Sequence, residues 1–169
     1  MDAVRTDDFI ELLVPTDFST GSRLAVDYAL TLASRLGASV HLVHVVEDPS
    51  VAGLFTDAHV DMALIRKERR VEGRYRMNGL LAALQARRAT DEIAAGPVAE
   101  TIARIAAERG SSLIVMGTHG RTGLAHALVG SIAERVIRIA SCPVLTVRQG
   151  LAGSAVLAAA QRREAAVSA

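Results

Sequence analysis

The chain has 169 residues and a formal net charge of +1 at pH 7; 50% of its residues are apolar but only 3% are aromatic. This length fits one domain with a core of aliphatic side chains. The near-neutral charge creates no general field that would attract nucleic acid. The single cysteine, Cys142, excludes an internal disulfide and a sulfur-based zinc site. Because no apolar stretch suits a signal peptide or a membrane span, we expect a cytoplasmic protein with no membrane partner.

Short apolar runs alternate with longer helical patterns, which predicts βαβ units and a parallel sheet. We expect strands over 9–14, 40–46, 91–95, 113–116 and 143–147, and helices over 19–36 and 58–88, from 96–97 and from Ser131. Gly37 follows the first helix, where it can act as a C-cap. The second strand is almost continuously apolar, as is typical of burial on both faces. Its His44 is interpreted as a hydrogen-bonded core residue, and its His41 belongs to no motif.

The expected helix over 58–88 is long and highly charged. Its apolar stripe is thin: Val60, Leu64, Val71, Tyr75, Leu80, Leu81 and Leu84. Gly73 and Gly79 should each weaken the helix by about 1 kcal/mol relative to alanine. It also carries a basic run: Arg66, Lys67, Arg69, Arg70, Arg74 and Arg76. Because Glu68 and Glu72 interrupt this run and aromatics are scarce, we interpret it as a solvated helix face and expect no nucleic-acid partner.

The helix that begins at Ser131 has the spacing of a capping box, with Glu134 three residues further on. Its expected buried stripe is Ile132, Val136 and Ile139.

The last expected strand begins with Pro143, which suggests a position at the edge of the sheet. We place the domain over 1–148. The alanine-rich residues 149–169 are expected to form an extra helix or a disordered tail.

A glycine pattern follows the buried run Leu113–Met116 directly. Its spacing is G-x2-G-x9-G-S, made by Gly117, Gly120, Gly130 and Ser131. Glycine lets the backbone approach an anion closely, and consecutive N–H groups with a helix N-terminus form an anion site. The lysine-containing phosphate loop G-x4-G-K-[ST] is absent, since the only lysine, Lys67, lies far from these glycines. The pattern predicts a phosphate or nucleotide site, although glycines that only form turns are the alternative.

The first expected strand also ends in polar residues, Pro15-Thr16-Asp17-Phe18-Ser19. In open parallel sheets, ligands bind beyond the carboxyl ends of the strands, where the strand order reverses. If the first and fourth strands are neighbours, both turns line one crevice. Asp17 would then accept hydrogen bonds from ribose hydroxyls while the glycine loop holds phosphates. The alternative is that Asp17 is a helix N-cap or a turn residue.

These motifs, taken together, resemble the universal stress protein family. The resemblance covers about residues 8–148 and rests on 15–19, 42–45, 116–123, 130–131 and 142–144. It implies an α/β fold: a Rossmann-like, single-domain, three-layer α/β/α sandwich with a five-stranded parallel sheet of order 3-2-1-4-5. Since the glycine pattern is complete, the resemblance further implies the subgroup that binds ATP.

The resemblance also implies roles for individual residues. Asp17 and Gly117 would meet the ribose, and the main chain of Val45, with Pro15 and Thr16 nearby, would meet the adenine. The phosphates would be held by Gly120, Gly130 and Ser131, with Mg²⁺ or Mn²⁺ bridging them. The predicted site is completed by Met116, His119, Arg121 and Ile132. For His119, a role in filling the loop is the alternative to phosphate or metal contact.

We therefore expect a nucleotide-responsive regulator that acts on a protein partner of unknown identity. The family resemblance implies a homodimer through the edge strand Pro143–Val147, which also exposes apolar residues suited to pairing. Because no general base is legible, ATP turnover should be slow or absent. Two alternatives remain: a genuine slow ATPase or self-phosphorylating protein that uses Ser131 or a nearby threonine, and a nucleotide-free interaction module.

Overall fold

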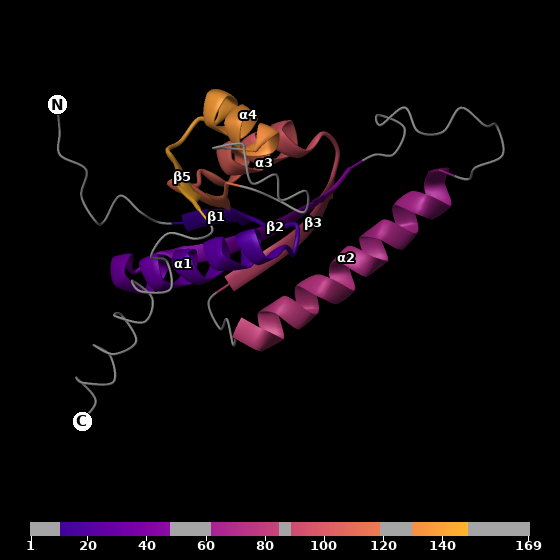
Figure 1. Cartoon of the computed structure of the whole chain (residues 1–169), viewed down its shortest axis with the longest axis horizontal. Coiled ribbons are helices and arrows are strands. Elements are labelled where there is room, and N and C mark those ends of the chain that lie inside the picture. The colour runs from indigo at the N-terminus through magenta and orange to yellow at the C-terminus, as the bar shows by residue number, and fades with distance from the viewer. Residues whose placement is uncertain (1–10, 48–61, 85–88, 119–129, 149–169) are drawn as a thin grey trace.

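The computed structural model describes residues 11–47, 62–84, 89–118 and 130–148. They form one parallel sheet between two layers of helices (Figure 1). The elements are β1 (Glu11–Pro15), α1 (Thr20–Leu36), β2 (Ser39–Val46), α2 (Met62–Leu84), β3 (Ala89–Ala95), α3 (Val98–Arg109), β4 (Leu113–Gly117), α4 (Ser131–Ile139) and β5 (Val144–Val147). The strand order is β3-β2-β1-β4-β5, which confirms the expected order.

Two hydrophobic cores lie on opposite faces of the sheet. Leu12 and Val14 of β1 pack on the side of α1 and α2, whereas Leu13 between them packs on the side of α3 and α4. Strand β2 alternates in the same way, with Leu42 on the first side and Val43 on the second. All five side chains are fully shielded from solvent. This double burial explains why both strands have almost continuously apolar sequences.

The predicted apolar stripe of α2 is wrong in its first half, whereas Leu80 is buried and Leu81 and Leu84 pack against the core as predicted. Leu64, Val71 and Tyr75 are 51%, 61% and 80% exposed. Among the described residues of α2, those buried on the side that faces the sheet are Gly73, Met77 and Leu80. A prediction based on large apolar residues does not include Gly73, although this glycine is part of the buried face. The expected helical residues 58–61 and 85–88, including Val60, lie outside the described residues.

Helix α4 begins at Ser131 as predicted, but not by the predicted capping box. Gly130 is the N-cap and makes no side-chain capping bond, so Ser131 is the first helical residue. Of the predicted buried stripe, Val136 is confirmed, whereas Ile132 and Ile139 are wrong, being 39% and 44% exposed. Ala133 and Val136 are the buried residues of this helix. The buried face of α4 therefore runs through Ala133 and Val136 rather than through the isoleucines.

The sheet ends at β5 on one side and at β3 on the other. The predicted edge position of the last strand is therefore confirmed, with Pro143 directly before β5. At the β3 edge, Asp91 forms an ion pair with Arg74 of α2. Charged residues at an edge disfavour pairing with a further strand. Among the described helices, none has the length and hydropathy required to cross a membrane.

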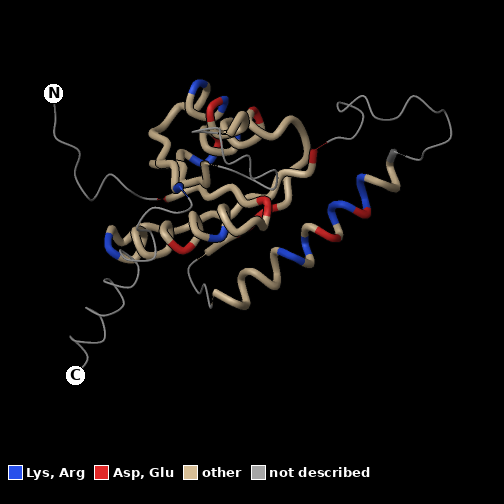
Figure 2. The backbone as a smooth tube through the Cα atoms, in the orientation of Figure 1, with Lys and Arg blue, Asp and Glu red and all other residues tan. Residues whose placement is uncertain are grey.

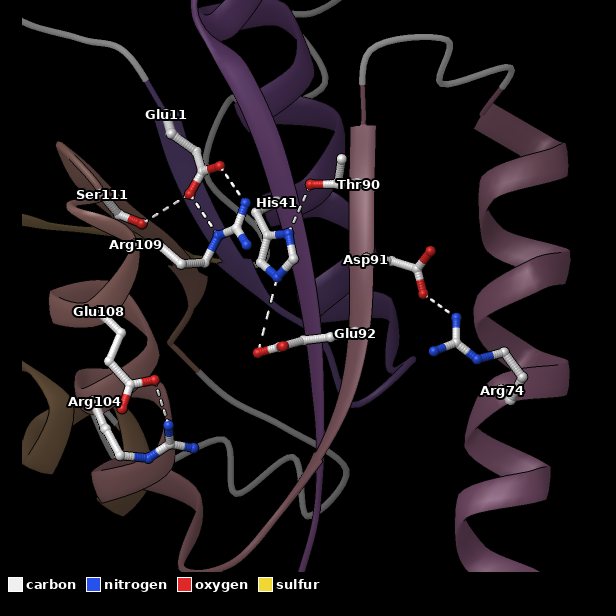
Figure 3. A network of polar contacts seen from close by, with 10 residues as sticks. All are labelled: Glu11, His41, Arg74, Thr90, Asp91, Glu92, Arg104, Glu108, Arg109 and Ser111. Carbon is white, nitrogen blue, oxygen red and sulfur yellow. Dashed lines mark hydrogen bonds and ion pairs between the residues drawn. The ribbon is translucent and has the colours of Figure 1, made fainter.

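A polar network ties the amino ends of the strands to the end of α3 (Figure 3). Glu11 of β1 accepts two hydrogen bonds from the Arg109 guanidinium, at 2.8 and 2.6 Å, and one from Ser111 at 3.2 Å. Burial raises the pKa of Glu11, but the hydrogen bond and charge of Arg109 outweigh this and lower it below 4.5. This bidentate pair fixes β1 against the C-terminus of α3.

His41 lies beside this network, buried in β2. Its Nδ1 is 2.7 Å from Thr90 Oγ1 on β3, and its Nε2 is 3.9 Å from Glu92 Oε1. His41 Nε2 and Glu92 Oε1 are both buried, and neither makes a hydrogen bond within the described part of the chain. Burial, followed by the positive charge of Arg109, lowers the pKa of His41 below 6.5. The sequence assigned no role to His41, and the structure gives it a place in cross-strand packing.

Candidate functional site

A cavity of ≈ 500 Å³ lies at the carboxyl ends of β1, β2 and β4. This volume is within the range of small-molecule sites. It is lined by every described residue of the predicted site: Pro15, Thr16, Asp17, Val45, Met116, Gly117, Gly130, Ser131 and Ile132. The other predicted residues, His119, Gly120 and Arg121, lie outside the described residues. The structure therefore brings together residues from four separate segments, as the crevice argument requires.

The adjacency of β1 and β4 creates this cavity. Leu12 pairs with Leu113 and Leu13 with Ile114, so both strands end at the same edge of the sheet. Their neighbours in the sheet, β2 and β5, lie outside them. Chains that leave β1 and β4 turn away from each other into different layers, which opens the crevice at this switch point.

The turn after β1 is held by a main-chain hydrogen bond to β2 and by hydrogen bonds to its own side chains. Thr16 N donates to Val43 O at 2.8 Å, and Thr16 Oγ1 accepts from Phe18 N at 3.0 Å. Asp17 Oδ1 accepts from Ser19 N at 3.0 Å and from Ser19 Oγ at 2.6 Å. The N-cap of α1 is Ser19, whose side chain accepts from Ser22 N. The alternative that Asp17 is the N-cap is therefore wrong, whereas its role in the turn is confirmed.

Thr118 and Gly130, which lie at the two ends of the segment between β4 and α4, are hydrogen-bonded to each other through their main chains. Thr118 N donates to Val147 O at 3.0 Å, and Gly130 N donates to Thr118 O at 2.7 Å. Gly117 also has a packing reason to be glycine, because a Cβ there would lie 3.0 Å from both C and O of Gly21 in the first turn of α1. Close packing against α1 is therefore a structural reason for glycine at Gly117, distinct from the turn-forming role given as the alternative.

The N-terminus of α4 opens onto the cavity. Gly130 is extended, with φ −72° and ψ 155°, and supplies no side-chain cap to the N–H groups of the first turn. Ser131 and Ile132 are exposed, and both line the cavity with Ala133. N–H groups at a helix start carry partial positive charge and attract anions. This arrangement can hold a phosphate without a lysine.

Helix α2 supplies a wall of the cavity that the sequence did not predict. Arg69, Glu72, Gly73 and Arg76 line it, next to Phe18 and His44. No motif marks these α2 residues, and they became visible only through the position of the helix beside β2. The basic residues of α2 are shown in Figure 2. Some of them contact the body of the protein, as when Arg69 Nη1 donates to Glu47 O at 3.4 Å, so the run is not solely a solvated face.

His44 belongs to this wall. Its Nδ1 lies 2.7 Å from Thr16 O, a carbonyl acceptor, so the ring donates this hydrogen bond. The prediction of a hydrogen-bonded residue is confirmed, but the side chain is half-buried at the cavity rather than within the core.

Within the described ranges there is no group of three His, Cys, Asp or Glu residues that could hold a metal ion.

Comparison with known proteins identifies the family. The model of the universal stress protein family matches residues 11–148. The chain belongs to this family. Universal stress protein MJ0531 of Methanocaldococcus jannaschii is 35% identical over 141 residues, covering 82% of each chain. Universal stress protein YxiE of Bacillus subtilis is 33% identical over 147 residues, covering 83% of this chain and 99% of its own.

Solved structures agree with the fold. MJ0577 of Methanocaldococcus jannaschii superposes with a TM-score of 0.73 at 27% identity, covering 83% of this chain and 96% of that one. A universal stress family protein from Burkholderia pseudomallei gives a TM-score of 0.66 at 33% identity, with the same coverage of 83% and 96%. The described chain is thus similar to complete family domains rather than to a fragment of them.

Proposed function

We propose that this universal stress protein binds an adenine nucleotide, with ATP as the preferred ligand, in the cavity at the carboxyl ends of β1, β2 and β4. One observation carries the proposal: the N-terminus of α4, whose N-cap is the glycine Gly130, faces the same cavity as the Asp17 turn. An anion-binding helix start and a carboxylate that can accept from hydroxyl groups suit the two ends of a ribose phosphate.

Two proteins that share the fold support the ligand class. One universal stress protein has been solved in complex with cAMP, and one from Archaeoglobus fulgidus in complex with dAMP. Their identities to this chain are 22% and 20%, with TM-scores of 0.57 and 0.56, so they share its fold. Extending adenine nucleotide binding from them to this chain is our proposal.

Within the proposed complex, Asp17 and Gly117 meet the ribose. The main chain of Val45 meets the adenine. The phosphates lie against Gly130 and Ser131, and Mg²⁺ or Mn²⁺ would accompany them and offset their negative charge. The ligand acts by occupancy in a cytoplasmic regulator: it changes the surface around the cavity that a protein partner meets. Hydrolysis is slow or absent in this proposal, and rapid phosphate release by the purified protein would contradict it.

The decisive experiment removes one main-chain N–H group. Proline is tolerated at the first position of a helix, and Gly130 already has the extended conformation that must precede it. Ser131→Pro therefore deletes the N–H with little damage to α4, and Ser131→Ala is the matched control that deletes only the hydroxyl.

Calorimetric titration with ATP should show a loss of about tenfold or more in affinity for Ser131→Pro, the effect of one hydrogen bond to a charged group. Ser131→Ala should lose much less. Equal losses would mean that the hydroxyl, and not the main chain, holds the phosphate. If the wild-type protein gives no heat and no thermal shift with ATP, the nucleotide-free interaction module is the better account.

We also propose a homodimer formed through β5. Val144 and Leu145 lie half-buried on this edge strand, and α4, which contacts β5, exposes 48% of Ile137 and 44% of Ile139. An edge strand beside exposed apolar side chains favours pairing with a second copy. Light scattering at micromolar concentration should give the mass of a dimer, and a monomeric mass would refute this part of the proposal.

A further inference from the structure

Phe18 has an unusual backbone conformation and is the neighbour of Asp17, the residue proposed to bind the ribose. It is the only non-glycine residue with positive φ in the described part of the chain, at 63°. Side chains with a Cβ are disfavoured in this left-handed region, so surrounding contacts must hold the residue there. Strained residues of this kind concentrate at ligand sites, and Phe18 directly follows Asp17.

Two side chains from other elements hold the Phe18 ring. The guanidinium carbon of Arg76 on α2 lies 4.7 Å from the ring centroid, within the range of a cation–π contact. The His44 ring on β2 lies 4.5 Å away between centroids, tilted by 41°. Phe18 itself is only 9% exposed. We call Arg76, Phe18 and His44 the Phe18 clamp.

The clamp is anchored at both ends. His44 Nδ1 bonds Thr16 O at 2.7 Å, which ties the ring to the turn that it clamps. On α2, a Cβ at Gly73 would lie 2.9 Å from His44 Cδ2, so the glycine allows the helix to reach the ring. The clamp thus links α2 to the β1–α1 turn through side-chain contacts.

The clamp acts on the backbone that carries Asp17. Thr16 Oγ1 accepts a hydrogen bond from Phe18 N, which joins the two neighbours of Asp17. Asp17 Oδ1 accepts from Ser19 N, which joins the carboxylate to the residue after Phe18. The position of the carboxylate therefore depends on the conformation at Phe18. Hydrogen bonds weaken steeply when distance or angle departs from the optimum.

We propose that Arg76 and Phe18 are positioning residues that set how strongly Asp17 distinguishes ribose from 2′-deoxyribose. The proposal rests on the proposed adenine nucleotide site and assigns α2 a part in its specificity. Arg76 also lines the cavity, and the effect proposed here is the one it exerts on Asp17 through the turn.

The readout is the ratio of the dissociation constants of dATP and ATP, both measured by calorimetry. Both nucleotides carry the same triphosphate, so a direct effect of the Arg76 charge on phosphate cancels in this ratio. Arg76→Leu should lower the ratio about two- to fivefold, the equivalent of an exposed cation–π contact. Arg76→Lys keeps a cation near the ring and should restore most of the ratio.

Arg70→Leu is the matched control, because Arg70 is exposed on the same helix and does not line the cavity. It should leave the ratio unchanged. If Arg76→Leu weakens ATP and dATP equally, or if Arg70→Leu lowers the ratio as much, the inference is overturned while nucleotide binding stands.

A measurement without ligand tests the clamp itself. Amide hydrogen exchange of Phe18 and Ser19 should quicken in Arg76→Leu and not in Arg70→Leu, because both amides donate within the clamped turn. Unchanged exchange would overturn the clamp. If the wild type binds neither nucleotide, the proposed function and the ribose role both fail, and faster exchange in Arg76→Leu would then leave the clamp as a device of the fold only.

Discussion

Gly73 and Gly79 lie on the same helix, and the structure predicts different effects for the same substitution to alanine. Both are interior positions of α2, where glycine is less favourable than alanine by about 1 kcal/mol. A Cβ at Gly79 would have no atom within 4 Å, whereas a Cβ at Gly73 would lie 2.9 Å from His44 Cδ2. Only at Gly79 does the gain in helix propensity come without a clash.

The clash at Gly73 is hard to relieve. The His44 ring is bonded to Thr16 O and packed against Phe18, so it cannot move without breaking one of these contacts. Overpacking of this kind costs about 1–3 kcal/mol. Gly79→Ala should therefore stabilise the protein by about 1 kcal/mol. Gly73→Ala should range from about neutral to about 2 kcal/mol less stable once the propensity gain is subtracted.

Urea unfolding of the two variants measures the difference directly. With a slope of about 2 kcal/mol per molar urea, typical of small domains, the midpoints should differ by about 0.5–1.5 M. The wild type should lie between the variants or level with Gly73→Ala. If both variants gain stability equally, the contact between α2 and His44 is not as the structure describes, and the Phe18 clamp loses its anchor.

Three further predictions concern the fold. First, since the pKa of His41 is lowered below 6.5, the unfolded chain binds the proton before the folded one. Stability should thus be full above pH 6.5 and decline as the pH falls below it. His41→Gln should flatten this decline in unfolding curves between about pH 7 and pH 5, and an unchanged slope would assign the decline to other groups. Second, Ser19→Ala removes the N-cap of α1 and should cost about 1 kcal/mol in the free energy of unfolding, whereas a loss near zero would discount the cap. Third, Gly37 ends α1 at φ 72° with open space around it, so Gly37→Ala should cost about 1 kcal/mol through backbone strain alone. Gly37→Asn should cost less, since asparagine tolerates this conformation better, and equal losses would contradict the strain argument.

The sequence predicts the alternation of strands and helices well, because buried parallel strands leave almost continuous apolar runs such as β2. The order of the strands came from the family resemblance, since periodicity does not reveal which strands pair. The cavity followed from the same resemblance: polar turns after β1 and β4 converge only if these strands are neighbours, as the pairing of Leu12 with Leu113 shows.

The helices were harder to predict at the level of faces. In α2 the face toward the sheet centres on Gly73, which has no side chain to mark burial, while Leu64 and Tyr75 are exposed. In α4 the buried residue Ala133 was not predicted, because the expected buried face was chosen from large aliphatic side chains. The positive φ of Phe18 left no trace in the sequence, because glycine is the residue that usually signals this conformation. The α2 wall of the cavity was missed for these reasons.

The position of a bound nucleotide in this protein is the most direct test of the proposed function. A crystal structure of the full chain grown with ATP and Mg²⁺ should place the triphosphate against the first turn of α4 and the ribose at Asp17. An empty cavity in saturating ATP, or a nucleotide bound anywhere else on the chain, would contradict it.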